Sequence, residues 1–269
     1  MNRLVGVNSN CYHNYSIENA IAGIHAAGFR YVELTATKGW TEHVFPSNSF
    51  SRLLEVRGLL ENYGLIPIAL SGHCNLADSD RIPDFIENIE LASFFQCNYI
   101  ISSIGEAHVK EEHEVTTEEA VRNISALVPL LEKKHMILAL ETHGIYGTGE
   151  KLKQVTDQIG SKYVKINYDT ANVIYYGKAD PAEDLSVCVQ DVVYMHLKDK
   201  AGKQSEWNFP ALGQGKIDFK GILKVLEKNH NDCPFSIEIE FTKDGPGTVD
   251  TVDQAVMESG EYLRWLEII

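Results

Sequence analysis

Four ionisable residues lie inside or at the end of apolar runs of this sequence. They are Glu141 in "LALETHG", Asp169 in "INYDTAN", His196 in "YMHLKD" and Glu238 in "FSIEIE". A carboxylate in such a run costs several kcal/mol unless it is paired or binds a metal. Three carboxylates and one imidazole suit a single divalent cation, with Mn²⁺, Mg²⁺ or Co²⁺ favoured over Zn²⁺. Any one of these residues alone is explained as well by an ion pair or a helix cap, so the hypothesis of a metal site rests on the four residues together.

The elements that must position these residues alternate along the whole chain. Short runs rich in β-branched and aromatic residues predict strands, and the longer amphipathic stretches between them predict helices. The first helix is expected to begin after Ser16 and to end at Gly28, which suits a left-handed cap. Eight strands are predicted, at residues 3–8, 31–36, 66–72, 99–104, 136–142, 163–169, 192–198 and 235–241.

Eight strands each followed by a helix predict an α/β fold, a closed (β/α)8 TIM barrel that forms a single domain over residues 1–269. An open doubly wound sheet is the alternative, but "VNSNCYHN" after the first strand is not the Gly-rich GxGxxG turn of such folds. In a barrel the C-terminal ends of the strands form the working surface. Because Glu141, Asp169, His196 and Glu238 hold equivalent places on the fifth to eighth strands, we expect them to converge.

The composition disfavours several other classes of protein. A formal net charge of −14 without a basic cluster argues against binding to nucleic acid or to an anionic membrane surface. Five widely spaced cysteines without a CxxC pair predict free thiols rather than disulfides or a thiolate zinc site. The start "MNRLVGVNSN" lacks the pattern of a signal peptide, and no apolar segment is long enough to span a bilayer, so we expect a soluble, cytoplasmic protein.

The motifs at the strand ends resemble those of the xylose isomerase-like barrel enzymes known as sugar phosphate isomerase/epimerases, which include the ketose 3-epimerases. The resemblance covers nearly the whole chain and rests on "LALETHG", "INYDTAN", "MHLKD", "PALGQGKIDF" and "FSIEIE". It implies that Glu141, Asp169, His196 and Glu238 bind one divalent metal ion. These are the same four residues that the strand positions select.

The resemblance also implies an enzyme that moves a proton next to the carbonyl of a sugar. A metal that chelates the carbonyl and the adjacent hydroxyl would stabilise an enediolate, with Glu141 and Glu238 as the acid/base pair. Return of the proton to the opposite face gives an epimerase, and its transfer to the neighbouring carbon gives an aldose–ketose isomerase. The main alternative is a lyase that dehydrates a keto-inositol or a related cyclic ketone.

One position departs from the family pattern. Many members have a His three residues after the Asp, whereas this chain has Asn172, which can bind a sugar hydroxyl but is a poor ligand for a transition metal. A multi-metal apurinic endonuclease needs that His and further ligands, which "ISSIG" and "WNFPALGQGKI" do not supply. A barrel that binds a sugar without turning it over is a further alternative, and metal titration followed by an epimerisation assay would separate the two.

Other residues near the strand ends complete the predicted site. His143, Asn172, His73 and Lys198 are candidates for binding the substrate, although a structural role for His73 and an ion pair for Lys198 explain these residues as well. Glu240 is expected to support Glu238 rather than to bind the metal. Without an Arg or Lys cluster, the predicted substrate is an unphosphorylated or weakly anchored sugar or polyol. The apolar C-terminal segment "GEYLRWLEII" is compatible with a homo-oligomer.

Overall fold

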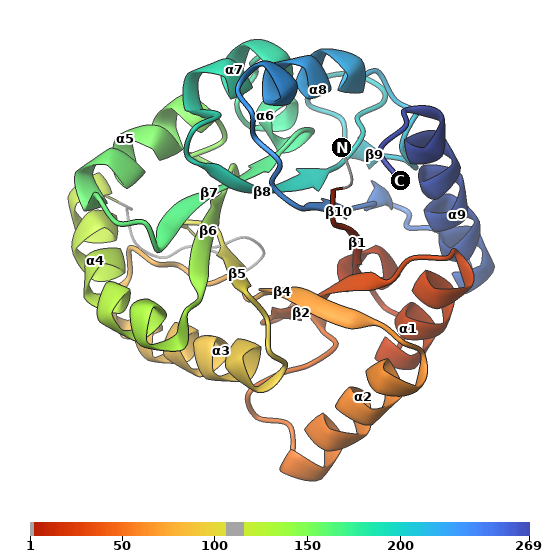
Figure 1. The fold of residues 1–269 in the computed structure, drawn as a ribbon, viewed down its shortest axis with the longest axis horizontal. Coiled ribbons are helices and arrows are strands. Elements are labelled where there is room, and N and C mark those ends of the chain that lie inside the picture. The colour runs from red at the N-terminus through yellow and green to blue at the C-terminus, as the bar shows by residue number, and fades with distance from the viewer. Residues whose placement is uncertain (1–2, 106–115) are drawn as a thin grey trace.

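The predicted alternation of strands and helices is found throughout the described chain. The computed structural model describes residues 3–105 and 116–269. In these residues eight parallel strands follow one another in the order β1-β10-β8-β7-β6-β5-β4-β2, and β2 pairs with β1, which closes the barrel (Figure 1). The strands are β1 (Val5–Asn8), β2 (Tyr31–Thr37), β4 (Ile66–Ser71), β5 (Tyr99–Ser102), β6 (Ile137–Glu141), β7 (Val164–Asp169), β8 (Val192–Leu197) and β10 (Phe235–Ile237). The predicted TIM barrel is confirmed.

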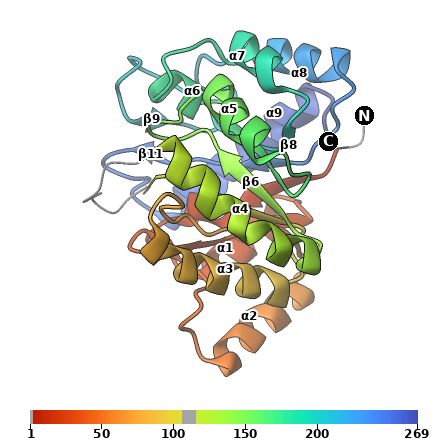
Figure 2. The ribbon, with the colours of Figure 1, turned by 90° about the vertical axis from the view of Figure 1, so that its left-hand side faces the viewer.

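Helices surround the barrel on the outside, as Figures 1 and 2 show. Each barrel strand is followed by one of the helices α1 (Ile17–Ala26), α2 (Phe50–Asn62), α3 (Ile82–Phe94), α4 (Thr117–Lys134), α5 (Gly149–Ile159), α7 (Pro181–Cys188), α8 (Phe219–Lys228) and α9 (Val249–Trp265). The connecting segments contain the short elements η1 (Ser9–Tyr12), β3 (Thr41–Glu42), η2 (Ser79–Arg81), α6 (Asn172–Tyr175), β9 (Asn208–Phe209) and β11 (Phe241–Thr242). No helix in the described residues has the length and apolar character needed to span a bilayer.

Capping residues in the sequence determine where several helices begin. The Ser16 hydroxyl accepts the backbone N–H of Asn19 at the start of α1, and the Thr148 hydroxyl accepts that of Lys151 at the start of α5. Such caps satisfy N–H groups that the first turn of a helix leaves unpaired. The predicted end of the first helix is also found, since Gly28 has a φ of 85° two residues after α1 ends.

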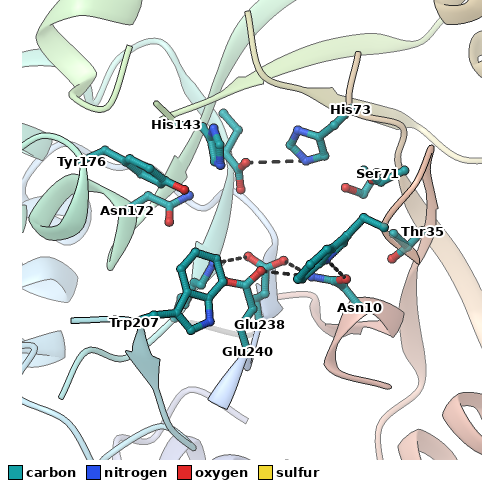
Figure 3. Close-up of a pocket in the computed structure, with 14 residues that line it drawn as sticks. Asn10, Thr35, Ser71, His73, His143, Asn172, Tyr176, Trp207, Glu238 and Glu240 are labelled. Atoms are coloured by element: carbon teal, nitrogen blue, oxygen red, sulfur yellow. Dashed lines mark hydrogen bonds and ion pairs between the residues drawn. The ribbon is translucent and has the colours of Figure 1, made fainter. Parts of the chain in front are cut away.

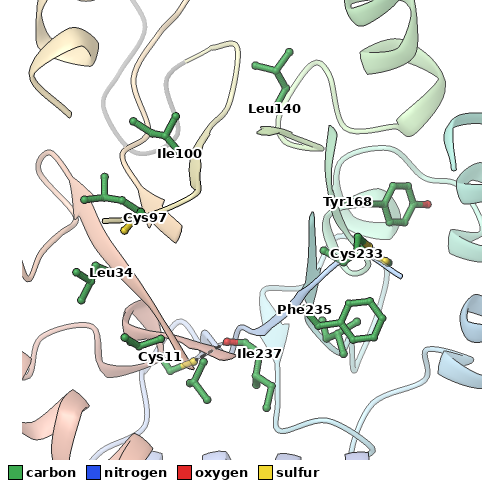
Figure 4. Packing of buried hydrophobic residues seen from close by; sticks show 14 of the residues in the cluster. Cys11, Leu34, Cys97, Ile100, Leu140, Tyr168, Cys233, Phe235 and Ile237 are labelled. Carbon is green, nitrogen blue, oxygen red and sulfur yellow. Dashed lines mark hydrogen bonds between the residues drawn. The ribbon is translucent and has the colours of Figure 1, made fainter. Parts of the chain in front are cut away.

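Buried side chains lie on both sides of the barrel sheet. Leu34, Ile100 and Leu140 are fully buried members of the main apolar cluster (Figure 4). Ile101 and Ala139, their neighbours along β5 and β6, belong to a separate small cluster. This is expected because successive side chains of a strand point to opposite faces of the sheet. All five cysteines are buried free thiols, as predicted from their spacing.

The last barrel strand is shorter than predicted. We expected a strand over residues 235–241, but β10 ends at Ile237. Phe241 has a φ of 58°, which is unusual for a bulky residue, and begins β11, which pairs antiparallel with β9 outside the barrel. The chain therefore leaves the barrel sheet at Glu238, and Glu240 lies in the segment between the barrel and β11.

Candidate metal centre and active site

Four strand ends bring the predicted metal ligands together. Glu141 and Asp169 are the last residues of β6 and β7, His196 is the penultimate residue of β8, and Glu238 directly follows β10. All four side chains are buried, and one ligand atom of each lies within 4.8 Å of the others. Since the C-terminal ends of barrel strands meet at one face, the convergence follows from the fold.

His196 makes contacts to all three carboxylates. Its Nδ1 lies 2.6 Å from Glu141 Oε1, 3.3 Å from Glu238 Oε2 and 3.9 Å from Asp169 Oδ2. The other oxygen of Asp169, Oδ1, accepts two backbone N–H groups of the following turn, each at 2.8 Å. Its buried Oδ2 has no hydrogen-bond partner among the described residues. A buried acceptor without a donor is costly, and a cation would satisfy it, so these residues fit a divalent metal ion.

Lys198 brings a positive charge into the cluster. Its Nζ lies 2.5 Å from Glu240 Oε2, 3.4 Å from Glu238 Oε2 and 3.7 Å from Asp169 Oδ2, and its side chain is 3% exposed. Burial alone would lower the pKa of the ammonium group, but the charges of Glu238 and Glu240 raise this pKa well above its ordinary value. Lys198 therefore stays protonated and balances part of the negative charge.

The two candidate acid/base groups have different electrostatic surroundings. Burial raises the pKa of Glu141 above its ordinary value, against the opposing effect of the hydrogen bond with His196. Burial would raise the pKa of Glu238 too, but the positive charges of Lys198 and His196 hold it well below its ordinary value. Neighbouring carboxyl groups whose pKa values are pushed apart are typical of acid/base pairs.

A small polar cavity beside the cluster has a volume of about 20 Å³, which is room for about one water molecule (Figure 3). Its wall consists of Asn10, Thr35, Thr37, Trp40, Ser71, His73, Glu141, His143, Asn172, Tyr176, Lys198, Trp207, Glu238 and Glu240. A second cavity of about 580 Å³ shares Asn10, Trp40, Trp207 and Glu240 with the first. The Trp40 indole is fixed by a 3.0 Å hydrogen bond from its Nε1 to Asn10 Oδ1. The aromatic side chains of Trp40 and Trp207 thus line both cavities.

The family assignment follows from a match to residues 21–266, which covers most of the chain. The chain belongs to the xylose isomerase-like TIM barrel family. This confirms the resemblance seen in the strand-end motifs.

Two curated relatives of this xylose isomerase-like chain differ in their activities. The chain is 28% identical over 177 residues to an inosose dehydratase from Clostridium perfringens (strain 13), an alignment that covers 60% of this chain and 57% of that protein. It is 24% identical over 168 residues to a putative L-ribulose-5-phosphate 3-epimerase from Escherichia coli, covering 60% of this chain and 56% of that one. The chain therefore matches little more than half the length of these relatives.

Solved structures of the same fold cover nearly all of the chain. A xylose isomerase domain protein from Planctomyces limnophilus has a TM-score of 0.79 at 19% identity, covering 99% of this chain and 98% of that one. A D-psicose 3-epimerase, crystallised in the presence of D-fructose, has a TM-score of 0.79 at 12% identity, and the match covers 98% of this chain and 99% of that one. At these identities the likeness establishes the shared fold.

All four predicted substrate-binding residues of this xylose isomerase-like barrel line the small cavity. His73 Nε2 lies 3.6 Å from Glu141 Oε2, and its Nδ1 is held by a backbone N–H just after β5 at 3.1 Å. His143 packs against Tyr176 with 4.5 Å between ring centroids. Asn172 begins α6 and is buried in the cavity wall (Figure 3). Lys198, the fourth, makes the ion pairs described above.

Several polar side chains at the site have no role in the sequence-based prediction. Asn10 Nδ2 donates to Glu238 Oε1 at 3.2 Å, and Asn8 Nδ2 lies 3.0 Å from Glu33 and 3.2 Å from Glu238. Glu33 itself lies 3.0 Å from His196 Nε2. A signal for Glu33 was present, because it is a carboxylate within the apolar run "YVELTA". Asn8 and Asn10 also stand at the end of the first predicted strand, but a neutral amide there does not indicate which acid it binds.

Proposed function

We propose that this chain is a divalent-metal-dependent isomerase or epimerase that moves a proton at a carbon next to the carbonyl of a small sugar or polyol. The observation that carries the proposal is the pair of carboxyl groups, Glu141 and Glu238, which line one cavity next to His196 and Asp169. The curated epimerase relative and the ketose epimerases of the same fold support this choice.

The proposed metal ligands are Glu141, Asp169, His196 and Glu238. Three oxygens and one nitrogen suit Mn²⁺, Mg²⁺ or Co²⁺, and Zn²⁺ also accepts such ligands. A divalent cation at this position would polarise a substrate carbonyl and stabilise negative charge on its oxygen. The Asp169 Oδ2 atom supports the assignment, because it is buried and has no hydrogen-bond donor among the described residues.

The pKa directions support different roles for the two carboxyl groups. Glu238 is the better base, because Lys198 and His196 keep its pKa low and its carboxylate ionised. Glu141 is the better acid, because burial raises its pKa. In the proposed reaction Glu238 removes the proton next to the carbonyl, and Glu141 donates a proton to the opposite face of the same carbon, which yields the epimer. Donation to the neighbouring carbon, with movement of the hydroxyl proton, would interconvert an aldose and a ketose.

The cavity wall favours a neutral substrate. His73, His143 and Asn172 offer groups that can bind sugar hydroxyls. Within the described residues, Lys198 is the one Lys or Arg side chain in this wall, and its charge is already balanced by carboxylates. A phosphate group would add negative charge without a matching cation, so we propose an unphosphorylated substrate.

A second candidate is dehydration of a keto-inositol or a related cyclic ketone. The curated inosose dehydratases point to it, and the two carboxyl groups Glu141 and Glu238 in the cavity wall support it. Glu238 would remove the proton next to the carbonyl, and the hydroxyl group on the following carbon would leave as water with a proton from Glu141, whose pKa burial raises. Epimerisation and dehydration would thus share the first step and differ in the second.

Incubation in deuterated water tests both candidates. The protein is supplied with Mn²⁺ and a panel of ketoses and keto-cyclitols, and the products are followed by NMR and mass spectrometry. An epimerase or isomerase incorporates deuterium into an isomeric product, whereas a dehydratase yields a product that has lost water. Both reactions require deprotonation next to the carbonyl, so Glu141→Gln and Glu238→Gln should reduce either one by about 100-fold or more.

A matched control is Asp184→Asn. Asp184 is a buried acid of α7 that accepts the N–H of Gly149 at the start of α5 and lies outside the cavity wall. This variant should keep the activity of the wild type. Full activity in both cavity variants would refute the two-acid scheme. Tight binding of Mn²⁺ without exchange in any ketose or cyclitol would favour a barrel that binds its ligand without turnover.

A further inference from the structure

Glu33 is a fully buried acid on β2, which is not one of the strands that carry the proposed metal ligands. It lies in the middle of β2, its exposed fraction is 0%, and both of its carboxylate oxygens are 3.0 Å from His196 Nε2. The strands β2 and β8 are not neighbours, because β1 and β10 lie between them in the sheet. The contact therefore crosses the interior of the barrel.

Asn8 fixes the orientation of this carboxylate. The Asn8 Oδ1 atom accepts the Thr35 hydroxyl at 2.8 Å and the backbone N–H of Asn10 at 2.9 Å, so its Nδ2 is left to donate. That Nδ2 lies 3.0 Å from Glu33 Oε1 and 3.2 Å from Glu238 Oε1. Glu33 thus accepts a hydrogen bond from the neutral Asn8 amide and faces the imidazole of His196.

The burial of Glu33 is not explained by folding alone. A leucine at this position of a buried strand would avoid the cost of burying a carboxylate, which amounts to several kcal/mol without a partner. Among the described residues, its ion-pair contact within 4 Å is with His196. The Glu33 carboxylate therefore interacts with the imidazole of His196.

We propose that Glu33 is a positioning residue of the metal centre, which accepts the Nε2–H of His196 and so turns the Nδ1 lone pair toward Glu141, Asp169 and Glu238. This inference rests on the proposed metal-binding role of His196. A carboxylate on the far nitrogen of a metal-binding imidazole fixes its tautomer and ring orientation, and loss of such a partner typically weakens metal binding about 10- to 100-fold.

The test compares Glu33→Leu, Glu33→Gln and the control Asp184→Asn. Binding of Mn²⁺ alone is measured by calorimetry and by the loss of the free-ion EPR signal, and unfolding is measured in parallel. We expect Glu33→Leu to bind Mn²⁺ about 10- to 100-fold more weakly than the wild type. Glu33→Gln should lose less, because its amide oxygen can still accept the Nε2–H. Asp184→Asn removes a buried carboxylate outside the site and should bind Mn²⁺ as the wild type does.

A spectroscopic readout separates positioning from a purely structural role. Nitrogen NMR of the histidine rings in the presence of Zn²⁺, which is diamagnetic, with His196 assigned from His196→Gln, should show the proton on Nε2 in the wild type and a mixture of tautomers in Glu33→Leu. If Glu33→Leu does not fold, the comparison of Glu33→Gln with the wild type serves as the test. Folded variants that bind Mn²⁺ within about twofold of the wild type, with an unchanged tautomer, would overturn this inference alone. A wild type that binds no Mn²⁺ would overturn the proposed metal centre and this inference together.

Discussion

Replacement of Lys198 by methionine should destabilise the protein by about 3 kcal/mol in metal-free buffer at pH 7. Methionine has a similar apolar stem, so the change removes the charge with little loss of packing. Three carboxylate oxygens then lose an ammonium group that lies within 3.7 Å of each of them. Removing one partner of a buried ion pair typically costs about 3–5 kcal/mol.

Protonation of a glutamate next to the missing ammonium group limits this loss of stability. A glutamate with an unfolded-state pKa of about 4.3 that is held protonated in the folded protein at pH 7 costs about 4 kcal/mol of stability. Burial already raises the pKa of Glu240 in the wild type, so part of this penalty is present before the substitution. A group whose pKa is raised by folding favours the folded state less as the pH increases. The difference in stability between the variant and the wild type should therefore be smaller at pH 5 than at pH 7.

Urea unfolding with EDTA and with Mn²⁺ measures this effect. Because Mn²⁺ replaces part of the missing positive charge, a concentration near 100 times its dissociation constant should restore about 3 kcal/mol. Lys153→Met is the matched control, since Lys153 pairs with Asp157 and Asp191 while 34% exposed, and such pairs are worth less than about 1 kcal/mol. A loss below about 1 kcal/mol for Lys198→Met in EDTA at pH 7 would refute the electrostatic reasoning.

Three further substitutions test other parts of the structure. Asp199→Ala should lower the melting temperature, because the Asp199 carboxylate accepts backbone N–H groups of the loop at Gly213; an unchanged melting curve would contradict this role. Asp191→Asn should cost about 1 kcal/mol or less at pH 7. Partial burial raises the pKa of Asp191, but Lys165 and a second lysine outweigh burial and lower this pKa below its ordinary value. The stabilisation by Asp191 should therefore be lost as the pH falls through its folded-state pKa. An equal loss of stability at pH 7 and in strong acid would contradict this prediction. Trp207→Ala should raise KM for the substrate several-fold with little change in kcat, because Trp207 lines both cavities; steady-state kinetics with an unchanged KM would exclude a contact with substrate.

The fold could be predicted because local sequence patterns indicate each of its strands and helices. Each barrel strand is a short apolar run between helices, and the closed order of eight parallel strands leaves few other arrangements. The motif "PALGQGKIDF" also has a local structural reason. Gly213 has a φ of 85°, and a Cβ at Gly215 would lie 2.1 Å from Asp199 Oδ1, so the loop can wrap around that carboxylate with glycine at both positions.

Contacts across the barrel could not be predicted in this way. The strand period indicates which face Glu33 occupies, but not that His196 lies opposite, since the two residues are separated by 163 positions in sequence. The end of β10 at Ile237 was missed for a similar reason. The run "FSIEIEF" continues the alternation of a strand, whereas the pairing of Phe241 with β9 draws the chain away from the barrel.

Asn172 contributes to the proposed centre through its backbone as well as its side chain. Its N–H donates to Asp169 Oδ1 at 2.8 Å, and the other oxygen, Oδ2, lies 3.7 Å from Lys198 Nζ and 3.9 Å from His196 Nδ1. Any residue type except proline could supply this N–H at position 172, so orienting the acid does not require the histidine that many family members have here. The side chain then adds a neutral amide to the cavity wall, where a histidine would add a ligand for a second cation. The asparagine therefore supports a centre with one metal ion and a polyol hydroxyl beside it.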